Sequence, residues 1–264
     1  MKSNHEIDYR IHGSEMQCVE IELDPQETVV AEAGSFMYMD NGVEMATIFG
    51  DGSQQNSGFM GKLFSAGKRL LTGESLFMTS FTNQAQSKKQ VSFASPYPGK
   101  IIPMDLSLLG GKVICQKDAF LCAAKGVSVG IEFQRKLGTG LFGGEGFIMQ
   151  KLEGDGMAFL HAGGHIIERE IQPGEKLKID TGCIVGFTQG VNYEIEMVKG
   201  VKNMIFGGEG FFFATLTGPG KVWLQTLPIS RLASRVMAYA GPGGKKEEGS
   251  LLGGLGNLLD GDGI

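Results

Sequence analysis

Short runs of alternating apolar and polar residues, separated by turn-forming residues, dominate the chain. The clearest runs are rich in β-branched and aromatic residues and cover residues 19–23, 28–33, 75–81, 146–152, 176–180, 192–198 and 210–216. Alternation with a period of two, bounded by Gly, Pro, Asn and Asp, predicts β-strands. Helical spacing of apolar residues is confined to residues 59–71, 131–137 and 230–239. The pattern therefore predicts an all-β protein with a few short helices.

One six-residue sequence, FGGEGF, occurs twice, at residues 142–147 and 206–211. Reading outward from Glu145 and Glu209 reveals a third copy around Glu74, in the sequence LTGESL. In each copy a glycine precedes the glutamate, a small residue follows it, and three apolar residues come next. This agreement predicts that each glutamate stands at the start of a strand in a repeated unit.

A second repeated position follows each glutamate at a fixed distance, where the chain has Asn83, Gly154 and Gly218. Glycine adopts positive φ without strain, and asparagine is the commonest other residue that tolerates it. We therefore predict a left-handed turn position at all three places.

The repeat also extends upstream, to Gly-Val pairs at residues 42–43, 126–127 and 190–191. The first copy is longer than the other two between its Gly-Val pair and its glutamate, and the extra polar, Gly-rich residues predict a loop inserted at residues 49–61. We expect three β units and a C-terminal segment, at residues 1–88, 89–160, 161–228 and 229–264. Small units of this kind should bury their faces against one another.

The C-terminal segment combines a short helix with a Gly/Leu-rich tail. The tail leucines fall at helical spacing, but three glycines lie among them, and each glycine costs about 1 kcal/mol relative to alanine in a helix. We expect the tail to be flexible. The alternative is a segment that folds against a protein partner or a membrane face.

Charge and composition exclude several classes of protein. The formal net charge is −5, whereas binding a nucleic-acid backbone requires clustered Lys and Arg. Glycine accounts for 42 of the 264 residues without the every-third-residue spacing of collagen. The composition is therefore typical of short strands joined by tight turns, and it argues against nucleic acid as a partner.

The cysteines and the N-terminal sequence bear on the compartment. The four cysteines form no C-x-x-C pair, and no apolar run follows the single basic residue near the N-terminus. The sequence also lacks a run of the roughly 18 apolar residues that a membrane-spanning helix needs. We predict a cytoplasmic protein whose thiols are reduced and half-buried.

Two short motifs resemble known binding sites. Residues 138–143 match the dinucleotide fingerprint G-x-G-x-x-G, but the residues after them read as strand and turn rather than as the helix that a pyrophosphate site requires. His161 and His165 have the spacing of zinc ligands on a helix, but two glycines separate them at the end of a predicted strand. We interpret them as ordinary turn histidines, and we predict no cofactor and no metal.

Glu74, Glu145 and Glu209 are the ionisable set that the repeat singles out. A carboxylate flanked by small residues can accept backbone N–H bonds at a turn or pair with a cation of the neighbouring unit. Catalysis would need a second acid or a nucleophile in each copy, and none repeats. We interpret the three glutamates as turn or interface residues, with a ligand site between units as the alternative, and predict no catalytic residue.

Several longer blocks resemble one known family. The blocks are FMGKLFSAGKRLLTGESLFMTSFTN, SPYPGKIIPMDL, LFGGEGFIMQKLEGDG and FGGEGFFFATLTGPGKVWLQT, and a Gly-Leu tail follows them. In this order they resemble the altered-inheritance-of-mitochondria protein 24 family, which includes bacterial members of unknown activity. The resemblance implies three tandem, shortened double-stranded β-helix units, as in the tryptophan RNA-binding attenuation protein. It also implies a homo-oligomer, with a trimer forming a ring of nine units.

These observations favour a non-enzymatic, oligomeric β scaffold or interaction protein, associated with a membrane or a stress-related complex. An unidentified protein partner and a peripheral membrane contact through the tail are expected with it. A small-molecule binding module with pockets between β units is the alternative. An unrecognised hydrolase or isomerase, or an RNA-binding protein, has less support, because the repeats supply no convergent polar groups and fold alone does not set function.

Overall fold

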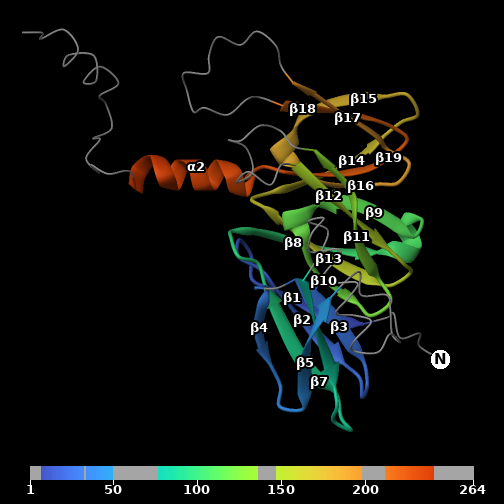
Figure 1. Ribbon diagram of the computed structural model, residues 1–264, viewed down its shortest axis with the longest axis vertical. Coiled ribbons are helices and arrows are strands. Elements are labelled where there is room, and N and C mark those ends of the chain that lie inside the picture. Colours follow the sequence, from blue (N-terminus) through green and yellow to red (C-terminus); the bar gives the residue numbers. More distant parts are fainter. Residues whose placement is uncertain (1–6, 33, 50–76, 136–146, 198–211, 241–264) are drawn as a thin grey trace, which may run out of the picture. The chain divides into compact units, whose positions relative to one another are not determined.

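A computed structural model of the chain describes residues 7–32, 34–49, 77–135, 147–197 and 212–240 (Figure 1). The chain divides into two compact units, residues 1–228 and residues 229–264. The described part of the first unit contains nineteen strands, and the second begins with helix α2 (Ile229–Ala240). The predictions of an all-β protein and of a helix at residues 230–239 are therefore confirmed.

The strands of residues 1–228 form four sheets in which neighbouring strands are antiparallel. Sheet 1 has the order β1 (Asp8–His12), β2 (Cys18–Leu23), β7 (Lys89–Ala94), β4 (Phe36–Met39). Sheet 2 has the order β5 (Val43–Phe49), β6 (Phe77–Asn83), β3 (Thr28–Glu32), β10 (Phe120–Ala124), β13 (Met157–Gly163), β8 (Gly99–Asp105). Sheet 3 has the order β11 (Ser128–Arg135), β12 (Phe147–Glu153), β9 (Lys112–Gln116), β16 (Ile184–Thr188), β19 (Gly220–Gln225), β14 (Ile166–Ile171). Sheet 4 has the order β15 (Lys176–Asp180), β18 (Phe212–Thr217), β17 (Asn192–Met197). The described residues also include the short 3-10 turns η1 (Leu106–Leu109), η2 (Lys117–Ala119) and η4 (Thr181–Cys183).

The order of strands in sheet 2 returns in sheet 3 when six is added to each label. Under the same shift, β4, β7 and β2 of sheet 1 match one half of sheet 2, and sheet 4 matches the other half of sheet 3. The strands predicted after the three glutamates are confirmed as β6, β12 and β18. The division into three β units, with its boundaries, stays a prediction.

Three hydrophobic cores lie between successive sheets. The core between sheets 1 and 2 includes Phe93, Phe81 and Phe159, the next includes Leu160, Leu152 and Trp223, and the third includes Met149, Phe187 and Leu216. β2 buries alternate residues, as a strand with one exposed face should, whereas all five residues of β10 are buried because cores lie on both of its faces. The succession of cores sets sheets 1 and 4 at opposite ends of the series (Figure 1).

One predicted helical segment is a strand. Residues 131–135 belong to β11, which pairs with β12 along its whole length. The register shifts between Ile131 and Phe133, where β11 has one extra residue relative to β12. Apolar residues at 129, 131 and 133 keep the period of two, and the predicted helix began at Ile131 and left out the first half of this alternation. The helix predicted at 59–71 and the loop predicted at 49–61 fall almost wholly outside the described residues, as does the tail from residue 241.

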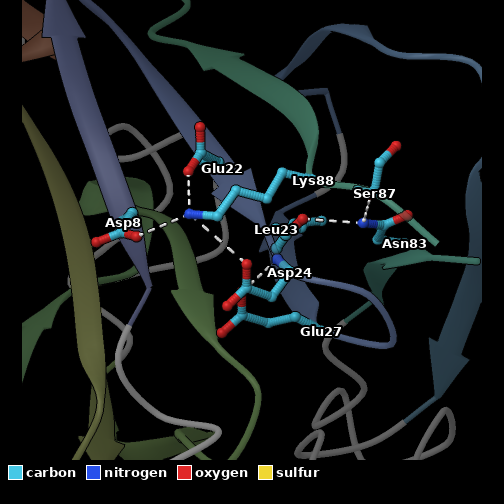
Figure 2. Close-up of polar contacts among 8 residues, drawn as sticks. All are labelled: Asp8, Glu22, Leu23, Asp24, Glu27, Asn83, Ser87 and Lys88. Carbon is cyan, nitrogen blue, oxygen red and sulfur yellow. Dashed lines mark hydrogen bonds and ion pairs between the residues drawn. The ribbon is translucent and has the colours of Figure 1, made fainter. Parts of the chain in front are cut away.

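Asn83 does not adopt the predicted left-handed conformation. Among the described residues other than glycine, only Gln26 has a positive φ, and of the three predicted positions only Gly154 has one. Asn83 is fully buried, and its Nδ2 donates to the carbonyl oxygens of Leu23 and Ser87 at 2.9 Å each (Figure 2). Its Oδ1 accepts the N–H of Ala85 at 2.9 Å. The Asn83 side chain therefore stabilises this turn through its hydrogen bonds rather than through a positive φ.

Gly218 also departs from the prediction, for a different reason. A Cβ at this position would lie 2.4 Å from the carbonyl oxygen of Gln172 and 2.6 Å from that of Ile171. Glycine is required there because two backbones approach each other closely.

The Asn83 turn leads to a charged cluster at its surface. The Nζ of Lys88 lies 3.5 Å from Asp8 and 3.6 Å from Asp24, and it donates to Glu22 (Figure 2). These carboxylates raise the pKa of Lys88, with the hydrogen bond to Glu22 as the largest cause. The cluster joins the β6–β7 turn to β1 and β2 at their exposed ends.

Replacing Asn83 by alanine should lower the free energy of unfolding by about 2–3 kcal/mol, because the buried carbonyl of Leu23 loses its side-chain donor along with the two other bonds. Urea unfolding followed by circular dichroism measures the change. Gln86→Ala, in the same turn and exposed, is the matched control and should change stability by less than about 0.5 kcal/mol. An equal effect of the two substitutions would contradict this role of Asn83.

Candidate functional site

The residues that the sequence singled out are placed in part. Glu74, Glu145 and Glu209, and the glycine motif at 138–143, lie outside the described residues. Their interpretation as turn or interface positions therefore stays a prediction.

The two histidines lie on and after a strand, as expected, rather than on a helix. His161 is a buried residue of β13, 2% exposed, and its ring packs edge-on against Tyr97 with the ring centroids 4.4 Å apart. Burial lowers the pKa of His161 to about 4. His165 is exposed after the strand ends, so the interpretation as a turn residue fits His165 and is wrong for His161. The described residues contain no group of three or more His, Cys, Asp or Glu that could hold a metal ion.

All four cysteines are free, as predicted. Cys18 and Cys183 are half-buried, as predicted, whereas the prediction is wrong for Cys115 and Cys122, which are wholly buried in strands enclosed between cores. Burial raises the pKa of both buried thiols. Across the described ranges, no helix is both long enough and apolar enough to cross a membrane.

An exposed apolar edge strand is the most unusual surface feature of the described residues. All four residues of β4 are exposed, and they are large and apolar: Phe36 (42%), Met37 (55%), Tyr38 (41%) and Met39 (36%). β4 pairs with β7 on one side only, because it is the last strand of sheet 1. An exposed edge of this composition invites pairing with another strand.

The strands that correspond to β4 in the sheet order are buried. β10 pairs with β13 on one side and with β3 on the other, and β16 pairs with β19 and β9 in the same way. All residues of β10 and four of the five residues of β16 are buried. We call these two pairings, β3 with β10 and β9 with β16, the inner joints. β4 therefore corresponds to a strand of an inner joint, but among the described residues it has a neighbouring strand on one side only.

β15 is the matching open edge at the other end of the series. It corresponds to β3 and β9, and among the described strands it pairs with β18 alone. Val30 and Ile114 are buried at the inner joints, whereas their counterpart Lys178 is exposed. Among the described residues, β4 and β15 are thus corresponding open edges of sheets 1 and 4.

One difference between the three repeated runs marks this edge in the sequence. The runs GSFMYM, DAFLCAA and GCIVGF occupy equivalent places before the Gly-Val pairs. At the place of Tyr38 the other two runs have Cys122 and Gly186, whereas at the place of Met39 they have Ala123 and Phe187. A tyrosine in place of cysteine and glycine indicates a different environment for this strand.

A pocket of about 570 Å³ is a second candidate site within residues 1–228. β9, β11, β16, β17 and the turn before β17 line it. Its walls include the rings of Phe133, Phe187 and Tyr193, and carboxylates stand at its rim.

Glu32, at the end of β3, is a half-buried carboxyl beside an inner joint. Burial, and to a smaller extent the charge of Asp118, raises the pKa of Glu32 to about 7. The folded protein therefore binds more protons than the unfolded chain between about pH 4.5 and 7, and the contribution of Glu32 to stability is lost as the pH rises through this window.

Glu32→Gln should remove that loss. Relative to the natural protein, the variant should gain up to about 3 kcal/mol in the free energy of unfolding between pH 4.5 and pH 8. Urea unfolding at several pH values measures this difference, and Glu44→Gln, at an exposed position, is the control. If the stability difference between Glu32→Gln and the natural protein does not vary with pH, the raised pKa of Glu32 is contradicted.

Known proteins that resemble the chain carry little functional information. An uncharacterized protein of Streptococcus pyogenes serotype M6 is 29% identical over 225 residues, which are 84% of this chain and 86% of that protein. A crystal structure of a protein from Streptococcus pyogenes has a TM-score of 0.68 and 22% identity, with 88% of this chain and 99% of that chain covered. The family model described as mitochondrial biogenesis AIM24 matches residues 9–227. With nearly all of residues 1–228 matched, the chain belongs to the mitochondrial biogenesis AIM24 family.

Proposed function

We propose that the protein is a non-enzymatic β scaffold that assembles from copies of itself through β4 and β15. The supporting observation is the exposure of β4, whose counterparts β10 and β16 are buried in joints. If β15 of one copy pairs with β4 of the next, sheets 4 and 1 become one sheet. Its strands from β17 to β2 follow the same succession as sheets 2 and 3, with β1 as an additional edge strand.

The inner joints set the expected register of this pairing. At the first joint Cys122 pairs with Ala31 and Ala123 with Val30, and the second joint has the equivalent pairs. Tyr38 and Met39 of β4 correspond to Cys122 and Ala123 of β10. The same register therefore sets Tyr38 opposite Ile179 and Met39 opposite Lys178 of the next copy. Backbone hydrogen bonds would then replace the unpaired N–H and C=O groups of both edges.

A joint between two different edges gives a head-to-tail contact, which closes into a ring when the rotation permits. In this proposal three copies, each with three β units, form a ring of nine units.

The C-terminal segment is proposed to bind an unidentified protein or a membrane surface. α2 supports this assignment, because Val236, Met237 and Tyr239 are exposed on a helix that also carries Arg231 and Arg235.

Native mass spectrometry of the natural protein tests the proposal. We expect one dominant species at three times the chain mass of 28.3 kDa. A protein that stays a single chain at micromolar concentration would overturn it.

A further inference from the structure

The pocket between β11 and β17 lies within a single chain, so it is independent of the proposed assembly. Its lining residues come from β9, β11, β16 and β17 and from the turn before β17. A volume of about 570 Å³ falls within the range of small-molecule sites.

The floor and walls of the pocket are apolar and aromatic. Ile114, Phe187 and Val191 are buried at its base. Tyr193 stacks on Phe187 with ring centroids 5.6 Å apart and an angle of 16° between the rings. Phe133 is tilted by 56° against Tyr193, with the centroids 5.5 Å apart. These side chains form a rigid surface on which an apolar ligand body can displace water.

The rim of the pocket is polar and negative. Glu132, Gln189, Asn192 and Glu194 are exposed there, and none of the described lining residues is a Lys or an Arg. Lys112 binds Glu132 at 2.9 Å, so this carboxylate already has a cation. Glu194 forms no ion pair with the residues that the structure describes. Its charge is available to a ligand.

The equivalent place between sheets 2 and 3 is filled differently. Counterparts 64 positions earlier in the chain are Ala123 for Phe187, Val127 for Val191, Val129 for Tyr193 and Gly130 for Glu194. The first three are buried in the shared core of those sheets. Small aliphatic residues therefore suffice to pack this part of the fold, and packing does not explain the tyrosine and the carboxylate of the pocket.

We infer that this pocket binds a small organic cation, a protonated amine or a quaternary ammonium with an apolar body. The apolar body lies against Phe133 and Tyr193, and the cation lies at the rim beside Glu194. Aromatic faces attract cations, and this attraction adds to that of the carboxylate. The two rim carboxylates repel an anionic ligand of the same shape.

Three probes of similar shape test the inference: phenethylamine, 2-phenylethanol and 3-phenylpropionate, which differ in charge. Protein-observed NMR titrations of the full chain give the dissociation constants. We expect phenethylamine to bind about tenfold more tightly than 2-phenylethanol and 3-phenylpropionate to bind most weakly. Added salt should reduce the preference for the amine.

Two variants separate the role of the carboxylate from a change in the fold. Glu194→Gln should weaken binding of phenethylamine about fivefold to tenfold and leave 2-phenylethanol unchanged. Glu44→Gln makes the same change in net charge at an exposed position on β5 and should alter neither constant. Three results would overturn the inference. The amine and the alcohol could bind with equal affinity, or no probe could bind at about 10 mM. The third is an affinity for the amine that Glu194→Gln leaves unchanged. None of these outcomes bears on the oligomeric state.

Discussion

Replacing Met39 by lysine should convert the assembled protein into single chains. In the proposed joint Met39 takes the place that Ala123 has at the first inner joint, where the residue is fully buried. A lysine there would lose its hydration without a partner, and it would stand directly opposite Lys178 of the next copy. Like charges opposite each other destabilise a strand pair, and an unpaired buried charge costs several kcal/mol. We expect the dissociation constant to rise at least about a hundredfold.

Size-exclusion chromatography with light scattering measures this change. Leu108→Lys provides the matched control, because Leu108 is a large apolar residue that is 82% exposed in η1, away from β4. The control should keep the assembly of the natural protein. If Met39→Lys assembles as Leu108→Lys does, β4 is not part of the contact between copies.

Replacing Phe81 by alanine should cost about 3–5 kcal/mol in the free energy of unfolding. Phe81 is 1% exposed on β6 in sheet 2, and it contacts two rings of sheet 1. Its ring stacks on Phe36 at 5.3 Å and meets Phe93 edge-on at 5.1 Å. Removing the ring leaves a cavity between the two sheets, and the surrounding backbone is too well paired to close it.

Urea unfolding of the natural protein, Phe81→Ala and Phe81→Leu measures this effect. The leucine variant keeps most of the apolar volume and should lose less than about half as much stability. A loss below about 1 kcal/mol for Phe81→Ala would show that this ring does not hold sheets 1 and 2 together.

Strand positions could be predicted from the sequence because local alternation and turn residues decide them. β2, β6, β12, β15 and β18 follow the predicted runs closely. β11 was misread because the predicted helix began at Ile131, so the alternation that starts at Val129 was not counted as a strand. Asn83 was misread because its role depends on the carbonyl of Leu23, which lies 60 residues away.

The candidate sites could be predicted less well, since they depend on which strands become neighbours. The run around Phe36 reads as a strand, but its exposure follows from the absence of a second neighbour for β4 among the described residues. The pocket assembles Phe133, Phe187 and Tyr193 from three strands of two sheets, and no local pattern joins them. The repeated glutamates were found by sequence alone and remain predictions.

The pairing of β4 with β15 is tested most directly by a disulfide between copies. Residues opposite each other in antiparallel strands have Cα atoms about 4.5–5.5 Å apart, which suits a disulfide. In a protein with both Met39→Cys and Lys178→Cys, mild oxidation should therefore give covalent species that end at three chains on a non-reducing gel. Each single variant should stay a single chain under the same conditions. If the double variant also stays a single chain, or if Met39→Cys alone forms covalent dimers, the head-to-tail joint is contradicted.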